Sequence, residues 1–162
     1  MCCGAQLARE VCYLIALDDE VIWRDASESP AHLPDSRARW EAIWASRDRL
    51  AVIAHSHPFG PLGFSSEDES TMSALRAALG RPPVFAVVAP GGVLLRSPAG
   101  DELVLRGSDE PPWAAGLRRD SGMATEPVGS RARPPTETEH EHEYEHEHEY
   151  EHEGTDLEMK EE

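Results

Sequence analysis

Residues 50–68 read LAVIAHSHPFGPLGFSSED, a stretch in which three different local patterns follow one another. Its first five residues form an apolar run rich in β-formers, which is typical of a buried strand. Residues 58–64 hold two prolines and two glycines and cannot continue that strand. From residue 65 to residue 79 the spacing becomes helical, with an apolar stripe formed by Met72, Leu75, Ala78 and Leu79. The stretch therefore predicts a strand, a sharp loop and an amphipathic helix.

Three side chains that can bind a metal lie within this stretch. His55 and His57 are two residues apart at the end of the predicted strand, so both imidazoles face the same side. Asp68 falls in the first turn of the predicted helix. The loop can fold back so that the helix start approaches the strand end. Three protein ligands with a water in the fourth position are typical of a catalytic zinc site.

Each part of this pattern also has an ordinary structural interpretation. Ser65 and Asp68 have the spacing of a capping box, in which the serine accepts a first-turn N–H and the acid reaches back. A histidine pair at a strand end is also common as a packed or surface pair. Only the combination of two histidines on one strand face, a sharp loop and an acid at a helix start favours a metal site.

The same residues carry a resemblance to a known family. His55-x-His57, followed after seven residues by Ser65-x-x-Asp68, resembles the signature of the JAMM (MPN-plus) metalloproteases. These are zinc enzymes that cleave isopeptide or peptide bonds at ubiquitin and ubiquitin-like proteins. Pro58, directly after the second histidine, also fits the pattern.

The family pattern includes a glutamate well upstream, on a strand of its own. Glu10 is the first candidate because it opens the apolar run 11–17, and its separation from His55 resembles that of the compact prokaryotic members. Glu20 is the second candidate, but it lies in the polar turn 18–20, where a solvated position is expected.

The resemblance implies a division of roles among five residues. His55, His57 and Asp68 would bind one catalytic zinc ion, which lowers the pKa of its water to about 7 and polarises the scissile carbonyl. Glu10 would take the proton of the water and pass it to the leaving amine. Ser65 would donate a hydrogen bond to the developing oxyanion. No cysteine nucleophile is required.

The resemblance also implies a single α/β domain, a mixed-sheet sandwich of the JAMM/MPN (cytidine-deaminase-like) type. The patterning of the chain predicts strands at 10–17, 21–24, 50–54, 84–89, 93–96 and 102–106, and helices at 37–48 and 65–79. Trp40 and Trp44 of the first helix are expected to pack on the sheet. Members of the family usually carry a helix before the glutamate strand. Only nine residues precede Glu10 here, so either the start of the chain is assigned too late or this member omits that helix, and its loss would expose one sheet face.

The chain is expected to divide into three parts: a JAMM-like domain at 1–106, a linker at 107–133 and a tail at 134–162. The linker holds Trp113, which can fold back onto the core. From His140 the tail repeats His-Glu-His-Glu-Tyr-Glu twice, with no hydrophobic face. Such a tract cannot offset its ordering entropy by burial and should be disordered.

Charge and cysteine content exclude several function classes. Of the net charge of −16, −12 falls within residues 134–162, so the rest of the chain is only mildly acidic. No basic patch indicates nucleic-acid binding, and no apolar run reaches the length of a membrane span. Cys2, Cys3 and Cys12 are odd in number and follow no signal segment, which favours a reducing cytoplasm, with Cys12 in the core.

The leading hypothesis is a zinc-dependent peptidase or isopeptidase that acts at the C-terminal tail of a ubiquitin-like or small sulfur-carrier-like protein. One alternative is a non-catalytic binding scaffold with the same fold. Another is a metal-handling protein that uses the five histidines of the repeat tail.

Overall fold

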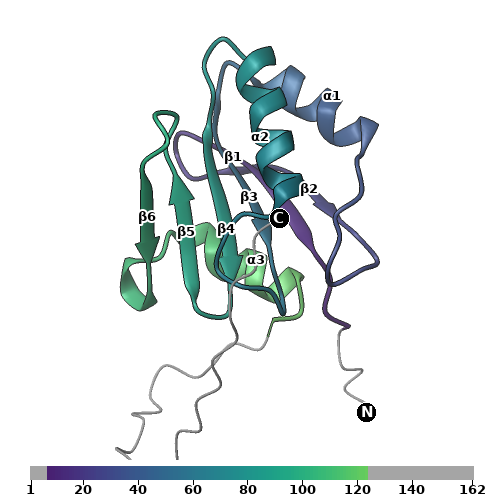
Figure 1. Cartoon of the computed structure of the whole chain (residues 1–162), viewed down its shortest axis with the longest axis vertical. Helices are drawn as coiled ribbons and strands as arrows, with labels where there is room; N and C mark the ends of the chain where they lie inside the picture. The colour runs from purple at the N-terminus through teal and green to yellow at the C-terminus, as the bar shows by residue number, and fades with distance from the viewer. Residues whose placement is uncertain (1–6, 124–162) are drawn as a thin grey trace, which may run out of the picture. The chain divides into compact units, whose positions relative to one another are not determined.

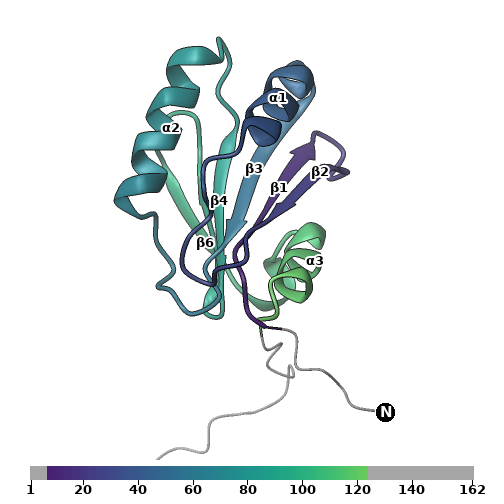
Figure 2. The same ribbon diagram turned by 90° about the vertical axis from the view of Figure 1, so that its right-hand side faces the viewer.

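A six-stranded mixed sheet forms the centre of the computed structural model, which describes residues 7–123. Its strand order is β2-β1-β3-β4-β5-β6. Figures 1 and 2 show α1 and α2 on one face of the sheet and α3 on the other. The elements are β1 (Val11–Ala16), β2 (Val21–Ala26), α1 (Arg37–Ser46), β3 (Leu50–Ser56), α2 (Ser66–Ala78), β4 (Val84–Ala89), β5 (Gly92–Arg96), β6 (Glu102–Leu105), the 3₁₀ turn η1 (Gly107–Asp109) and α3 (Pro112–Asp120). The predicted fold class is confirmed, and every predicted helix and strand is present with ends within two residues.

The sheet places β3 at its centre, between β1 and β4. β3 pairs antiparallel with β1 and parallel with β4, so α2 is the crossover that joins the two parallel strands. A parallel pair of this kind is buried on both faces, which explains the apolar run before His55. The C-terminal end of β3 therefore lies next to the first turn of α2.

Alternating residues of β1 supply two separate cores. Val11, Tyr13 and Ile15 face the α3 side, and Cys12 and Leu14 face the helices α1 and α2. Every one of these residues is at most 2% exposed. Cys12 is a core residue, as predicted, and burial raises the pKa of its thiol to about 12.

The predicted linker is wrong for residues 107–123, because η1 and α3 lie there. Trp113 packs against the sheet, as expected, and it does so as part of the helix α3. Pro112 suits a helix start, and Trp113, Ala114 and Leu117 then present one apolar face. The domain accordingly extends beyond residue 106. The rest of the linker, the tail at 134–162 and the pair Cys2 and Cys3 lie outside the described residues.

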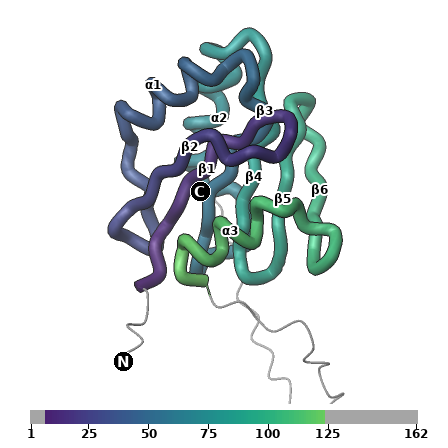
Figure 3. The backbone as a smooth tube through the Cα atoms, turned by 180° about the vertical axis from the view of Figure 1, so that it is seen from behind, coloured from purple at the N-terminus to yellow at the C-terminus, as the bar shows by residue number. Residues whose placement is uncertain are grey.

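Helix α3 also corrects the expectation of an exposed sheet face. It packs against β1, β3 and β4, as the view from behind in Figure 3 shows. Tyr13 donates a hydrogen bond of 2.5 Å to the Asp120 carboxylate and ties β1 to the end of this helix. The sheet face that was expected to be exposed without a helix before β1 is therefore covered by α3, which follows β6 in the sequence.

The two tryptophans of α1 differ in their surroundings. Trp40 is half-buried and packs against the core between the helices and the sheet, as predicted. Trp44 is 56% exposed and lies beneath the guanidinium of Arg47, so its predicted packing on the sheet is wrong. Only one side of this short helix faces the sheet, and Ile43 occupies it. Among the described residues, none of the helices combines the length and the apolar character that crossing a membrane requires.

Candidate metal centre

Two histidines project from the end of β3 toward α1 and α2. His55 is the penultimate residue of β3, and His57 follows the strand directly. Pairing with β4 continues past the strand end, because the His57 N–H donates to the Val88 carbonyl at 2.8 Å. Between the two histidines, the fully buried Ser56 accepts a hydrogen bond from the Val11 N–H at 2.9 Å. Both neighbours of β3 therefore hold the histidine pair in place.

The third donor, Asp68, lies in the first turn of α2. Ser65 is the N-cap, and its hydroxyl accepts from the Asp68 N–H at 3.1 Å. The Ser65 N–H and hydroxyl both donate to Asp68 Oδ2, at 2.7 and 2.8 Å. The capping box considered from the sequence is thus present. It occupies Oδ2, and Oδ1 lies 3.0 Å from His55 Nε2, so the capping box leaves Oδ1 available to bind a metal ion.

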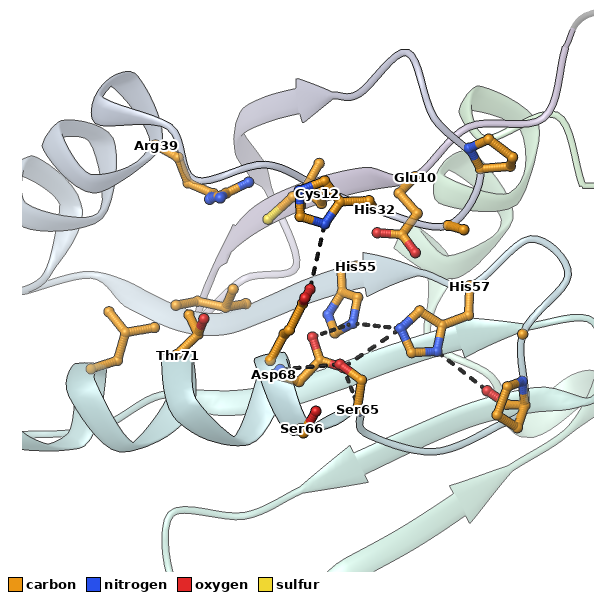
Figure 4. A pocket seen from close by; sticks show the side chains of 18 of the residues that line it. Glu10, Cys12, His32, Arg39, His55, His57, Ser65, Ser66, Asp68 and Thr71 are labelled. Carbon is orange, nitrogen blue, oxygen red and sulfur yellow. Dashed lines mark hydrogen bonds and ion pairs between the residues drawn. The ribbon is translucent and has the colours of Figure 1, made fainter.

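The three side chains form one compact cluster of donor atoms (Figure 4). His55 Nε2 lies 3.1 Å from His57 Nε2 and 3.0 Å from Asp68 Oδ1, and His57 Nε2 lies 3.6 Å from Asp68 Oδ2. Ligand bonds of about 2.0–2.1 Å in a tetrahedral zinc site place donor atoms about 3.3 Å apart. The two separations from His55 Nε2 lie close to that value, and one donor atom from each of the three residues lies within 4.8 Å of the others, so this donor set can hold a zinc ion.

The charges of the cluster are coupled. Burial disfavours the charged form of Asp68, but hydrogen bonds from His55 and His57 outweigh it and hold the pKa of Asp68 well below its usual range. Burial lowers the pKa of His57, whereas the hydrogen bond to Asp68 and that to the Pro61 carbonyl raise it, and the net shift is upward. An anionic carboxylate between two imidazoles attracts a cation.

The loop after His57 approaches its imidazole closely at Gly60. A Cβ at Gly60 would lie 3.0 Å from His57 Cβ and 3.4 Å from Cγ, whereas one at Gly63 would meet nothing within 4 Å. The Pro61 carbonyl in the same loop accepts from His57 Nδ1 at 3.3 Å. Such outer contacts orient a metal-binding imidazole and keep the other nitrogen free.

Gly60→Ala is therefore expected to weaken zinc binding by about 10- to 100-fold, the usual effect of disturbing such a contact. Gly63→Ala is the matched control and should bind zinc like the parent chain. Zinc affinity is measured by chelator competition on the full chain. The parent chain and both variants carry the same tail, so any zinc bound by the tail is the same in all three measurements. Equal affinities for the two variants would contradict the role assigned to Gly60.

Glu10 lies in the cavity that contains the three donors, directly before β1. It is 8% exposed, and its backbone pairs with the loop after β2, donating to Ser29 and accepting from Ser27. Burial raises the pKa of its carboxyl, opposed by the nearby imidazoles of His55 and His57. This position agrees with the one predicted for the upstream glutamate.

The second glutamate candidate lies elsewhere. Glu20 is in the β1–β2 turn, at the opposite end of β1 from Glu10. It is exposed, and its carboxylate accepts from Arg49 at 2.7 Å. The structure thus brings Glu10, and not Glu20, to the three donors.

The donors open into a cavity of about 540 Å³ between α1, α2 and the sheet. Sequence reasoning did not assign several residues to its walls: Cys12, His32, Arg39, Trp40 and Thr71. His32, in the loop before α1, is exposed, and its Nδ1 lies 3.4 Å from Glu67 of α2, a contact drawn in Figure 4. Of these residues, Cys12 could have been predicted from the sequence. It is two positions after Glu10 in an extended segment, so both side chains point to the same side.

The fold and these donors together define an α/β domain of the JAMM/MPN type with a candidate three-donor metal centre. A comparison with protein families agrees: the model described as prokaryotic homologs of the JAB domain (Prok-JAB) matches residues 2–100. The chain belongs to this Prok-JAB family, as the motif predicted. A search of curated proteins found no match. Helix α3 lies beyond the matched residues.

Proposed function

We propose that this protein is a zinc-dependent metallopeptidase or isopeptidase. Its substrate would be a peptide or isopeptide bond at the C-terminal tail of a ubiquitin-like or small sulfur-carrier-like protein. The observation that supports this most is the convergence of Glu10 with His55, His57 and Asp68 in one cavity. Three neutral or anionic donors and one further carboxylate can together support metal-assisted hydrolysis of an amide.

The roles follow from the positions of the side chains. Zinc held by His55, His57 and Asp68 would supply an activated water and polarise the scissile carbonyl. Glu10 makes no side-chain hydrogen bond or ion pair with the other described residues, so its carboxylate is free to accept the proton of the water. It then donates that proton to the leaving amine. Without the proton the amine would be a poor leaving group.

Ser65 is the residue that we propose donates a hydrogen bond to the developing oxyanion. Its hydroxyl donates to Asp68 Oδ2 in the structure, while its backbone N–H donates to the same oxygen. Rotation of the hydroxyl toward the substrate would therefore leave Asp68 held by the N–H. A hydrogen bond that forms only as charge develops on the carbonyl oxygen lowers the barrier without tightening substrate binding.

The proposal is tested with zinc and with model substrates. The purified chain should bind close to one zinc ion at the centre, and it should cleave ubiquitin-like proteins whose terminal Gly-Gly is fused to a reporter. Chelation should abolish cleavage and added zinc should restore it. Zinc binding without cleavage of any such fusion would contradict the proposal and favour the non-catalytic scaffold.

A further inference from the structure

Strand β6 forms one edge of the sheet, and no described segment lies beyond it (Figure 1). Its residues Leu103 and Val104 are 57% and 42% exposed, so an apolar side chain lies on each face of this edge. The only charged residue of β6, Glu102, is the first of the strand. The opposite edge, β2, carries Arg24 and Asp25 within the strand, and such charges usually keep an edge from pairing with another chain. Of the two edges, β6 is therefore the one that can accept a further strand.

The pairing of β6 with β5 decides which of its backbone groups face the free edge. The Ser97 N–H donates to the Asp101 carbonyl at 2.9 Å, which makes this a hydrogen-bonded pair at the turn between the two strands. Hydrogen-bonded and non-hydrogen-bonded pairs alternate along an antiparallel ladder, so Leu103 and Leu105 direct their backbone groups toward β5. Val104 lies between them and therefore presents its N–H and carbonyl to the free edge.

The residues two positions before and after Val104 share its orientation. Arg106 follows the strand with a backbone that is still extended, at φ −143° and ψ 148°. Glu102 accepts hydrogen bonds from Arg96, and Arg96 also donates to Glu69 of α2, so these side chains lie on the α2 face of the sheet. Val104 and Arg106 lie on that face too. Among the described residues, Arg106 donates only to a backbone carbonyl. This face of the edge therefore presents an acidic, an apolar and a basic residue in turn.

We propose that β6 pairs antiparallel with β6 of a second copy of this chain, with Val104 opposite its own counterpart on a twofold axis. In this register Glu102 lies opposite Arg106 of the partner subunit, and Arg106 lies opposite the partner's Glu102. Opposite charges that face each other across two strands stabilise the pairing. On the α3 face, where Leu105 packs, Leu103 lies opposite the partner's Leu105. The edge is thus complementary to itself in charge and in apolar character when one copy is reversed.

The same register fits the free backbone groups. Val104 and its counterpart would form a hydrogen-bonded pair, and so would Glu102 and Arg106 of the partner subunit. The two sheets would continue as one, with both α2 faces on the same side. Because β6 runs parallel to β3, the two metal centres would lie at opposite ends of the joined sheet. One short strand from each copy makes a small contact, so the dimer should depend on concentration.

Sedimentation equilibrium of the full chain tests the association. The buffer contains a chelator, so that metal bound by histidines of the tail cannot join two copies. The average mass of the parent chain should rise from the monomer value toward twice that value between about 10 μM and about 1 mM. Val104→Asp places two carboxylates opposite each other and removes the apolar contact, so it should weaken the dimer by about 10-fold. Leu17→Asp is the matched control, because Leu17 is 71% exposed in the β1–β2 turn.

Disulfide formation tests the register, in a chain whose Cys2 and Cys3 are replaced by serine. Val104→Cys places two Cα atoms about 5.5 Å apart across the axis, within the range that a disulfide spans. Leu103→Cys is the matched control, because its counterpart is diagonal to it, at about 7–8 Å. Mild oxidation should therefore link Val104→Cys into dimers and leave Leu103→Cys largely unlinked.

Three results would overturn the inference. The first is a parent chain that stays monomeric up to about 1 mM. The second is a dimer that Val104→Asp and Leu17→Asp leave equally intact, since the copies would then meet through another surface. The third is faster crosslinking of Leu103→Cys than of Val104→Cys. If circular dichroism shows that Val104→Asp does not fold, Arg106→Glu must weaken the dimer instead, because it brings like charges together at an exposed position. The dimer goes beyond the proposed function, and none of these measurements depends on hydrolysis.

Discussion

Glu10→Gln should bind zinc with the affinity of the parent chain and lose hydrolysis by about 10²- to 10⁴-fold, the usual contribution of a general base. The amide has nearly the size of the carboxylate but cannot accept the proton. Glu10 contributes no donor atom to the cluster of His55, His57 and Asp68, so zinc should be retained. Zinc content and kcat on a Gly-Gly fusion substrate are measured together for each protein.

Glu20→Gln is the matched control for this prediction. Glu20 is exposed, paired with Arg49 and at the other end of β1, so its amide variant should cleave at the parent rate. Cleavage by Glu10→Gln at the parent rate would show that the base is assigned to the wrong residue. A loss of both zinc and activity would instead place Glu10 in a structural role.

Trp113→Ala should lower the free energy of unfolding by about 3–5 kcal/mol, the usual cost of removing a buried tryptophan. Trp113 is 5% exposed and lies in the core between α3 and the sheet. Trp44→Ala removes the same side chain from a site that is 56% exposed, and it should change stability by no more than about 0.5 kcal/mol. Urea unfolding followed by circular dichroism measures both variants.

The same packing predicts the behaviour of shortened chains. A chain that ends at residue 106 lacks α3 and leaves the apolar face of β1, β3 and β4 uncovered, so it should not unfold cooperatively. A chain that ends at residue 123 keeps the helix and should unfold like the full chain. Equal stabilities for Trp113→Ala and Trp44→Ala, or cooperative unfolding of the 106-residue chain, would contradict the role assigned to α3.

The part of the fold that the sequence predicts well is local. The strand, loop and helix within 50–79 are encoded by an apolar run, by prolines and glycines, and by helical spacing over adjacent residues. The donors His55, His57 and Asp68 come together because that local geometry leaves few alternatives. The glutamate lies outside this segment and could be chosen only through the family pattern, which the position of Glu10 matches.

The parts that could not be predicted depend on contacts between distant segments. A helix as short as α3 has a weak signal of its own, and its packing partner Tyr13 is about a hundred residues earlier in the chain. The cavity is lined by residues of β1, β3, α1 and α2, so no single stretch of sequence reveals that Arg39 and Cys12 line it. The exposure of Trp44 likewise depends on where α1 lies on the sheet.

Helix α3 also determines when the domain can be completed during translation. The contact between Tyr13 and Asp120 joins residues 107 positions apart. At a synthesis rate of about 5–20 residues per second, β1 leaves the peptidyl-transferase centre about 5–20 s before the helix that covers it. Once β3 and β4 have also been made, the nascent chain carries an apolar sheet face that stays uncovered until α3 follows. Slow translation of the segment before α3 would lengthen the period in which a chaperone, or a second nascent chain, can bind that face.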